Sequence, residues 1–346
     1  MEKKEWGFVL SGGGAKGAYE IGVWKAIREL KLEKMITAVS GTSVGSLNAV
    51  LFAQGDYEKA EQIWSTISME KILSPKELKA VDIKEIDEEV KSLLVQEVMP
   101  HVPKPIRVIV SWIKNIDHAL CKLLLPAYLV SFAKKSFPIY TAMKLVPIFL
   151  TCVHQFLSIT SFQEAFQVAS YIFRTILGDG LFSQDGLEAI IHQNVDLDKI
   201  RKSKIAIYMH TYNISKLQEE TFYIDEKNLQ DLTTIMLASS AIPIIYEDVL
   251  LHGDKYIDGG MPLIGNNVPV NTLYEKGYRN LIVVGMDEDM DEIEGYEGSR
   301  IYLVKPKKSL GGAFCGTLNF QSNYTKKLIK KGYEDAMALL KEIQSV

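Results

Sequence analysis

The sequence contains little cysteine. Its three cysteines, Cys121, Cys152 and Cys315, are an odd number in a chain of 346 residues, and no two of them are spaced as C-x-x-C. An odd count without paired spacing excludes a disulfide framework and argues against a zinc site. We therefore expect a protein of a reducing, cytoplasmic compartment.

The chain also lacks an excess of positive charge. It carries 39 Lys and Arg against 43 Asp and Glu, which gives a formal net charge of −4. Proteins that bind nucleic acid usually show a basic excess, so we expect no nucleic-acid partner. Hydrophobic residues make up 47% of the chain, which excludes wholesale disorder and is sufficient for a large core.

Residues 101–163 also lack a long uncharged segment. Within them, the longest stretch without Asp, Glu, Lys or Arg runs over 145–163, only 19 residues, and it includes Pro147 and His154. The apolar run near the start, Trp6–Leu10, ends at Ser11 and is too short for a signal peptide. We therefore do not expect a membrane-spanning helix.

Strand, glycine loop and helix alternate at the start of the chain. The short apolar run 6–10 stops at a glycine loop, and apolar residues then recur with helical spacing at Ile21, Trp24, Ile27 and Leu30. A second strand is expected at 35–39, followed by another small-residue turn and another helix. This alternation predicts an α/β fold with a mainly parallel sheet, whose ligands bind at the carboxyl ends of the strands.

The same rhythm returns in the second half of the chain. Apolar periodicity predicts strands at 204–209, 221–224, 281–284 and 301–304, and helices over 187–191, 229–238 and 318–343. The acidic run 287–297 lacks the glycine that a calcium loop needs, because Glu292 holds that position. We interpret this run as a solvated surface loop.

The second turn matches the pattern G-x-S-x-G at a strand-to-helix junction. Its residues are Gly41, Thr42, Ser43, Val44 and Gly45. In this context the serine is presented on a tight turn, the two glycines avoid a collision between strand and helix, and the helix N-terminus supplies positive potential. Ser43 is therefore a candidate nucleophile, although an ordinary small-residue helix start has the same composition.

The first glycine loop has two interpretations. Its residues are Gly12, Gly13, Gly14, Ala15, Lys16 and Gly17, which match G-x-G-x-x-G. A dinucleotide site would require an acidic residue at the end of the second strand, where the chain instead has Ser40 and Gly41. The alternative is an oxyanion hole built from backbone N–H groups, which a nearby nucleophilic serine favours.

A nucleophilic serine needs a base. The best-placed acid is Asp258, which Gly259 and Gly260 follow, and none of the six histidines comes after it in the chain. A catalytic triad in the chain order serine, acid, histidine therefore cannot include Asp258 as its acid. A two-residue arrangement remains, in which Asp258 accepts the proton of Ser43 directly.

Together, these motifs resemble the patatin-like phospholipase family. The glycine loop 12–17, the turn 41–45, the segment 238–243 and the motif 258–260 occur in the family's order, and the resemblance covers about 5–75 and 180–305. It implies a three-layer α/β/α fold, a dyad of Ser43 as nucleophile and Asp258 as base, an oxyanion loop at 12–17, and hydrolysis of lipid acyl esters through an acyl-enzyme without a cofactor.

The stretch between the two matched blocks departs from the family pattern. We expect a single domain over 1–346, with a helical insertion at 76–179 and a helical C-terminal tail at 306–346. Within the insertion, 101–163 holds seven basic residues and one acidic residue, a charge of +6, which leaves −10 for the rest. Residues 109–123 have the pattern of a cationic amphipathic helix, which predicts contact with an anionic membrane surface or a helical lid.

The sequence thus predicts a lipid acyl hydrolase of the phospholipase A type, peripherally associated with a membrane. Two alternatives remain open. The glycine loop could belong to a nucleotide-binding protein, or the segment 101–163 could be the functional part of a noncatalytic membrane-associating protein. Intact Ser43 and Asp258 argue against the second alternative, because an inactive scaffold has no chemical need for both.

Overall fold

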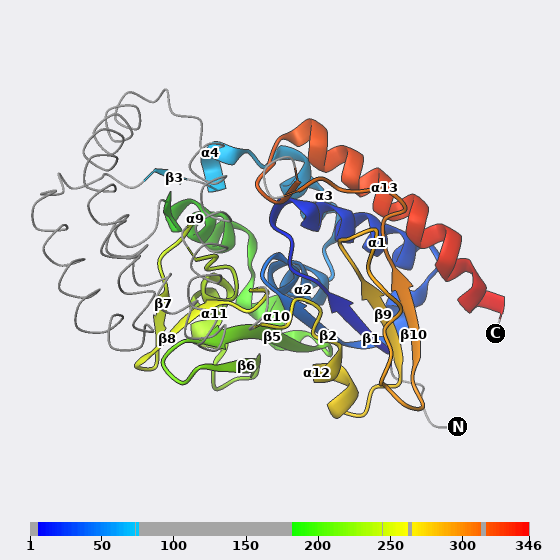
Figure 1. Ribbon diagram of the computed structural model, residues 1–346, viewed down its shortest axis with the longest axis horizontal. Helices are drawn as coiled ribbons and strands as arrows, with labels where there is room; N and C mark the ends of the chain where they lie inside the picture. The colour runs from blue at the N-terminus through cyan, green and yellow to red at the C-terminus, as the bar shows by residue number, and fades with distance from the viewer. Residues whose placement is uncertain are drawn as a thin grey trace, which may run out of the picture. The chain divides into compact units, whose positions relative to one another are not determined.

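The computed structural model describes residues 6–72, 74–75, 182–243, 245–261, 265–312 and 316–345 (Figure 1). These residues belong to one compact unit of the chain, formed by Met1–Lys76 and Asp179–Val346. The expected insertion 76–179, with its basic segment 101–163, lies outside the described residues, as do the three cysteines.

The elements alternate along the chain much as the sequence predicts. The helices of the first block are α1 (Ala18–Glu29), α2 (Val44–Gln54), α3 (Tyr57–Thr66) and α4 (Met69–Ile72), and its strands are β1 (Trp6–Leu10), β2 (Ile36–Thr42) and β3 (Ser74–Pro75). The second block has helices α9 (Asp185–Asn194), α10 (Leu197–Lys202), α11 (Leu232–Ser239), α12 (Val270–Glu275) and α13 (Ser322–Leu340), and strands β4 (Phe182–Ser183), β5 (Ala206–Asn213), β6 (Gln218–Tyr223), β7 (Val249–Leu251), β8 (Asp254–Asp258), β9 (Asn280–Val284) and β10 (Arg300–Val304).

A mostly parallel sheet forms the centre of this unit. Within the described residues its order is β10-β9-β1-β2-β5-β8-β7, and β6 pairs with the other edge of β5. Strands β10, β9, β1, β2 and β5 are mutually parallel, whereas β6 and β8 run antiparallel to β5. The parallel strands β1 and β9 are almost wholly buried, which is typical of a sheet covered on both faces.

Successive side chains of β1 point into two different layers. Phe8 contacts Phe52 of α2, and Phe52 contacts Trp24 of α1. Val9 points the other way, into a cluster with Leu273 of α12. The expected three-layer α/β/α fold is therefore confirmed, with α1 and α2 on one face of the sheet and α12 on the other (Figure 1).

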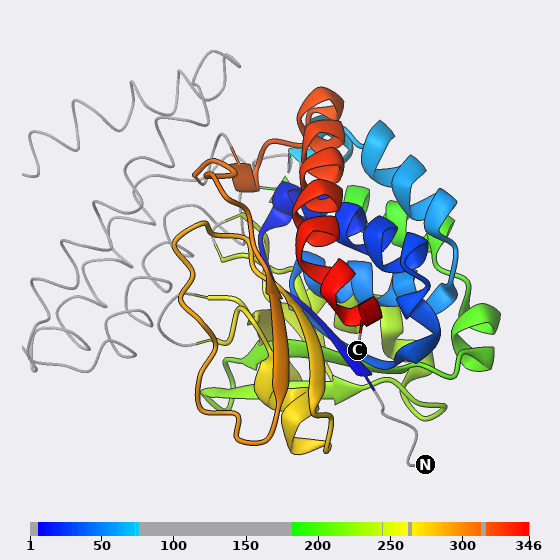
Figure 2. The ribbon, with the colours of Figure 1, turned by 90° about the vertical axis from the view of Figure 1, so that its right-hand side faces the viewer.

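The C-terminal helix α13 lies along α1 (Figure 2). Two glycines let the backbones approach closely: a Cβ on Gly22 would lie 2.0 Å from the carbonyl oxygen of Ile329, and a Cβ on Gly332 would lie 2.0 Å from that of Tyr19. A hydrogen bond of 3.0 Å from the Tyr19 hydroxyl to Asp335 joins the same two helices.

Two strands are longer than the sequence predicts. The strand expected at 35–39 continues to Thr42, and the one expected at 204–209 continues to Asn213. Most of the added residues are small or polar and yet buried, so the apolar pattern does not reveal them. No helix within the described ranges is long and apolar enough to cross a membrane.

Candidate active site

Ser43 lies between β2 and α2, at the carboxyl end of a central strand. Its backbone has φ 55° and ψ −126°, and positive φ of this kind costs a residue with a side chain about 1–3 kcal/mol. The residue is only 5% exposed, and it lines an apolar pocket. A strained, nearly buried serine that borders a pocket has the geometry expected of a nucleophile on a tight turn.

The two glycines of this turn allow the helix to pass directly beside the sheet. A Cβ on Gly41 would lie 2.3 Å from the carbonyl oxygen of Gly45, and a Cβ on Gly45 would lie 2.4 Å from that of Leu10. Thr42, between them, donates its hydroxyl to the carbonyl of Asn266 at 2.8 Å. Side chains larger than hydrogen at 41 and 45 would therefore push α2 away from β1 and β2.

Ser239, at the end of α11, holds the backbone of Ser43. Its Oγ accepts a 2.9 Å hydrogen bond from the N–H of Ser43 and donates to the carbonyl of His210 at 2.7 Å. The hydroxyl of Ser46 lies 2.8 Å from the same oxygen and donates to the carbonyl of Gly41 at 2.7 Å. Two fully buried hydroxyls thus join α11, β5 and the serine turn.

Strand β5 brings Asp258 to Ser43. β6 pairs with one edge of β5 over Tyr208–Asn213. Strands β2 and β8 pair with parts of the same stretch of β5, so both must lie along its opposite edge. There Thr42 of β2 is opposite His210, and Asp258 of β8 is opposite the next residue, Thr211. Because β2 and β8 run in opposite directions, their carboxyl ends meet at this point.

The carboxyl of Asp258 is buried and hydrogen-bonded. It accepts a 2.7 Å hydrogen bond from the N–H of Gly260, and the residue is 4% exposed. Burial raises the pKa of Asp258 to about 6, while hydrogen bonds from the Ser43 side chain and the Gly260 backbone oppose that rise. Such a carboxylate is ionised at neutral pH and is more basic than an exposed one.

The glycine loop approaches the serine from β1. A Cβ on Gly12 would lie 3.2 Å from Cβ of Ser43 and 2.3 Å from Oδ1 of Asn267. The N–H of Gly12 donates to the carbonyl of Asn267 at 3.1 Å, and the side-chain amide of Asn267 donates back to the carbonyl of Gly12 at 3.2 Å. Gly12 is thus fixed in place, and its own N–H is already engaged.

The rest of this loop forms a short 3-10 turn at Gly14–Gly17 that leads into α1. Ala15 and Gly17 are buried, and a Cβ on Gly17 would lie 2.6 Å from a methyl group of Val44. Lys16 is also largely buried, with its ammonium 3.3 Å from the carboxylate of Asp287, which begins the acidic run 287–297. This run has the loop structure that the sequence predicts.

Each of the three described histidines has its ring engaged with another residue. His192 is paired with Glu188, His252 with Asp231, and the Nδ1 of His210 lies 3.0 Å from the hydroxyl of Thr221. Burial lowers the pKa of His210 to about 4, so this ring is neutral at ordinary pH. No cluster of three or more metal-ligating side chains occurs in the described part of the chain.

The pocket beside Ser43 is lined almost entirely by apolar side chains. It encloses about 740 Å³, part of which is open to solvent. Gly14 and Ser43 lie on its wall, and helices α2, α3 and α9 supply most of the rest. A site of this character suits an aliphatic group next to the reacting atoms.

Sequence reasoning missed two residues of the site. Asn267 fixes the glycine loop, and Oδ1 of Asn267 would lie 2.4 Å from a Cβ on Gly260, so one side chain borders both glycine motifs. Ser239 falls within a segment that the family resemblance includes, but its contact with Ser43 had no signal in the sequence. Single small polar residues have no periodicity, and only their place in the fold reveals them.

Comparisons with known proteins identify a family and similar solved structures. A family model described as patatin-like phospholipase matches residues 8–274. No curated protein sequence matches the chain. The chain is similar in structure to VipD from Legionella pneumophila, with 15% identity, a TM-score of 0.48, and coverage of 98% of this chain and 67% of that one.

The chain is also similar to ExoU of Pseudomonas aeruginosa, solved in a heterodimeric complex with SpcU from the type III secretion system. The identity is 15% and the TM-score 0.38, with 99% of this chain and 52% of that chain covered. The chain therefore spans about half the length of ExoU.

Proposed function

The chain belongs to the patatin-like phospholipase family, and on this basis we propose that it is a serine lipid acyl hydrolase that cleaves acyl esters of phospholipids or related lipids. The observation that carries the proposal is the meeting of β2 and β8 on one edge of β5, which brings a strained serine to a buried carboxylate. An apolar pocket at the same serine supports a lipid as substrate.

In the proposed reaction, Asp258 takes the proton of Ser43 as the serine oxygen attacks the ester carbonyl carbon. The carbonyl π bond opens to a tetrahedral oxyanion. When that intermediate collapses, the bond to the leaving alcohol breaks, and Asp258 returns the proton to the alcohol oxygen. Water then attacks the acyl-enzyme with Asp258 again as base, and the fatty acid leaves while Ser43 regains its proton.

We assign the oxyanion to the glycine loop. Because the N–H of Gly12 is bonded to Asn267, the donors that we propose are the N–H groups of Gly13 and Gly14. Each donor of this kind contributes about 3 kcal/mol to the stability of a tetrahedral intermediate. The same engagement of Gly12 argues against the dinucleotide alternative, in which the loop would turn its N–H groups toward a pyrophosphate.

A serine-directed fluorophosphonate tests the dyad. Wild-type protein should be labelled covalently, Ser43→Ala should not be labelled, and Asp258→Asn should react far more slowly, while thermal melting confirms that both variants are folded. Ser203→Ala removes a half-buried serine that follows α10 and does not line the pocket, so it should label as wild type does. Label that persists in Ser43→Ala would show that the nucleophile is another residue.

We further propose that the basic segment 101–163 binds an anionic membrane surface. The proposal rests on its charge of +6 and its amphipathic pattern, since each basic residue near such a surface contributes about 1 kcal/mol. Replacing Lys114, Lys122, Lys134 and Lys135 with Gln should abolish sedimentation with phosphatidylglycerol vesicles. Equal binding of the wild type to neutral phosphatidylcholine vesicles would contradict the electrostatic part of this idea.

A further inference from the structure

Three helices supply about half of the residues that line the pocket beside Ser43, and Met236, Tyr246 and Phe320 are among the others. Along α2, the lining residues are spaced three and four apart, so they form one continuous stripe that starts beside the serine. The stripe on α9 has the same spacing. The lining residues are Val44, Leu47, Asn48 and Leu51 on α2, Leu187, Ile190, Ile191 and Asn194 on α9, and Ile63, Trp64 and the adjoining Ile67 on α3.

The one polar side chain in the middle of the α2 stripe is fully engaged elsewhere. Asn48 accepts a 2.9 Å hydrogen bond from the indole of Trp64 and donates to the carboxyl of Glu20 at 2.7 Å and to the carbonyl of Gly17 at 3.0 Å. Both of its donors and its acceptor oxygen therefore have partners within the protein. The channel is apolar along its length, including at this residue.

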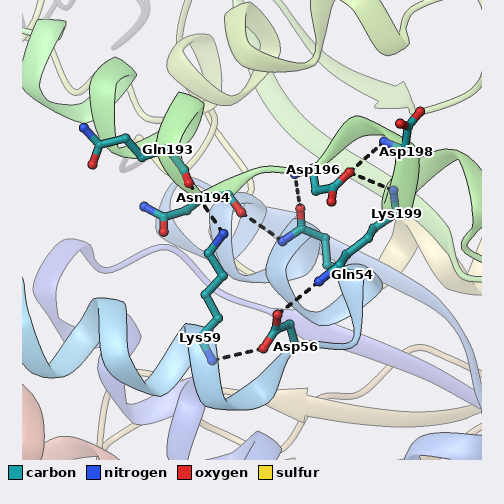
Figure 3. A network of polar contacts seen from close by, with 8 residues as sticks. All are labelled: Gln54, Asp56, Lys59, Gln193, Asn194, Asp196, Asp198 and Lys199. Atoms are coloured by element: carbon teal, nitrogen blue, oxygen red, sulfur yellow. Dashed lines mark hydrogen bonds and ion pairs between the residues drawn. The ribbon is translucent and has the colours of Figure 1, made fainter.

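A polar network links the ends of α2, α3 and α9 to α10 (Figure 3). It lies next to Asn194, which lines the pocket. Gln54, the last residue of α2, donates to the carbonyl of Asn194 at 3.2 Å and accepts from the N–H of Asp196. Lys199 forms a 3.1 Å ion pair with Asp56, the residue that caps α3. The C-terminal end of α2, the N-terminal end of α3 and the C-terminal end of α9 thus converge on one cluster of charged and amide groups.

From this arrangement we propose that the pocket holds a single acyl chain end-on and that the polar network sets an upper limit to its length. The inference rests on the proposed acyl hydrolase function and names the part of the substrate that the site selects. The ester carbonyl lies at Ser43, the chain follows the stripe of α2, and its methyl end meets Leu51 and Asn194. An alkyl chain that continued past this point would have to enter a charged and hydrogen-bonded cluster.

The helix gives the length of the channel. From Val44 to Leu51 the rise along α2 is about 10 Å. An extended alkyl chain advances about 1.3 Å per carbon, because its C–C bonds are about 1.5 Å long and zigzag. About eight carbons therefore fit between Ser43 and the polar network. Activity should therefore rise from butyryl to octanoyl esters and fall for palmitoyl esters.

Two variants test the limit from opposite directions, with kcat/KM measured on p-nitrophenyl butyrate, octanoate and palmitate. Leu51→Trp shortens the channel, so the ratio of octanoate to butyrate activity should fall about tenfold or more. Gln54→Ala removes both hydrogen bonds of the network to the 194–196 segment, so the ratio of palmitate to octanoate activity should rise about tenfold. Gln62→Ala, the same change on the exposed side of α3, should keep the wild-type profile.

A binding measurement separates this inference from the proposed function. Calorimetry of the Ser43→Ala protein with butyrate, octanoate and palmitate should show tightest binding of octanoate, without any turnover. If the wild type hydrolyses none of the esters but still binds octanoate most tightly, the proposed hydrolase function is wrong and the proposed limit on chain length is supported. If esters are hydrolysed and Gln54→Ala keeps the wild-type chain-length profile, the length limit is wrong, whether or not Leu51→Trp folds.

Discussion

The backbone N–H of Ser43 donates a 2.9 Å hydrogen bond to the hydroxyl oxygen of Ser239, which lies 196 residues further along the chain. Ser239 is fully buried, and its own hydrogen is directed to the carbonyl of His210 on β5. The strained turn that presents Ser43 is thus fixed to the strand that also positions Asp258. In the proposed reaction, this contact makes Ser239 a positioning residue that acts through Ser43.

We expect Ser239→Ala to lower kcat by about tenfold to a hundredfold, because a buried N–H left without a partner costs about 1–3 kcal/mol and the turn can relax. KM should change little, since Ser239 does not line the pocket. Ser240→Ala is the control for kcat: Ser240 lines the pocket, and its hydroxyl donates to the carbonyl of Met236, four residues earlier, at 2.9 Å. Steady-state kinetics on a soluble ester measures both. Equal losses in kcat for the two variants would contradict the role of Ser239.

The packing of α13 on α1 leads to a prediction about stability. Alanine is favoured over glycine inside a helix by about 1 kcal/mol, so Gly332→Ala should stabilise an isolated α13. In the protein, however, its Cβ would lie 2.0 Å from the carbonyl oxygen of Tyr19, which is backbone and cannot rotate away. We therefore expect a net loss of about 1–3 kcal/mol in the free energy of unfolding, measured by urea denaturation.

Gly312→Ala provides the comparison for this prediction. Nothing lies within 4 Å of a Cβ at Gly312, so that variant should unfold at the wild-type urea concentration or slightly above it. A Gly332→Ala protein as stable as Gly312→Ala would mean that α13 does not pack closely against α1 in solution.

The part of the site that is local in the chain could be predicted from the sequence. The glycine loop follows its strand directly, and Ser43 stands directly between a strand and a helix, so short-range patterns were sufficient to place both at strand ends. The pairing of Ser43 with Asp258 depended on the family resemblance. Its physical cause is the register of β2 and β8 on β5, which joins segments more than 200 residues apart.

The contacts that the sequence did not reveal are made by polar residues inside strands and loops. Strand β5 extends through His210, Thr211 and Asn213, which are buried with hydrogen-bond partners, whereas the apolar pattern indicated an end at 209. The ion pair of Lys16 with Asp287 joins the glycine loop to the acidic run, which the sequence showed only as two separate charged features. Such contacts depend on tertiary structure, because no periodicity identifies them.

The raised pKa of Asp258 predicts how the reaction depends on pH. Only the ionised carboxylate can accept the proton of Ser43, and the pKa of Asp258 is about 6. We expect kcat/KM to fall about tenfold per pH unit below about pH 6 and to be level above it. A water-soluble p-nitrophenyl ester should be used, so that binding to a lipid surface does not contribute to the profile. A rate that stays level to about pH 4.5 would contradict Asp258 as the base.

The raised pKa of Asp258 also means that its ionised carboxylate destabilises the folded protein. A salt-bridged acid, whose pKa is lowered, has the opposite effect on the free energy of unfolding. The folded-state pKa of Asp258, about 6, lies above the ordinary value of 3.8, so between those two pH values the folded state keeps a proton that the unfolded chain has lost. The free energy of unfolding therefore decreases as pH rises through this window. Above about pH 6 the deficit is constant, about 3 kcal/mol for a shift of this size.

Asp258→Asn should remove this cost, because asparagine is neutral at every pH and its side-chain oxygen can still accept the hydrogen bond from Gly260. We expect the inactive variant to be more stable than the wild type by up to about 3 kcal/mol at about pH 7.5, and the difference to vanish near pH 4. Asp254→Asn is the control of opposite sign, since a hydrogen bond from Lys216 lowers the pKa of that partly exposed carboxylate. It should not stabilise the protein at about pH 7.5. Urea denaturation of all three proteins at both pH values measures these differences. If Asp258→Asn were less stable than the wild type at the higher pH, burial would not destabilise the ionised carboxylate.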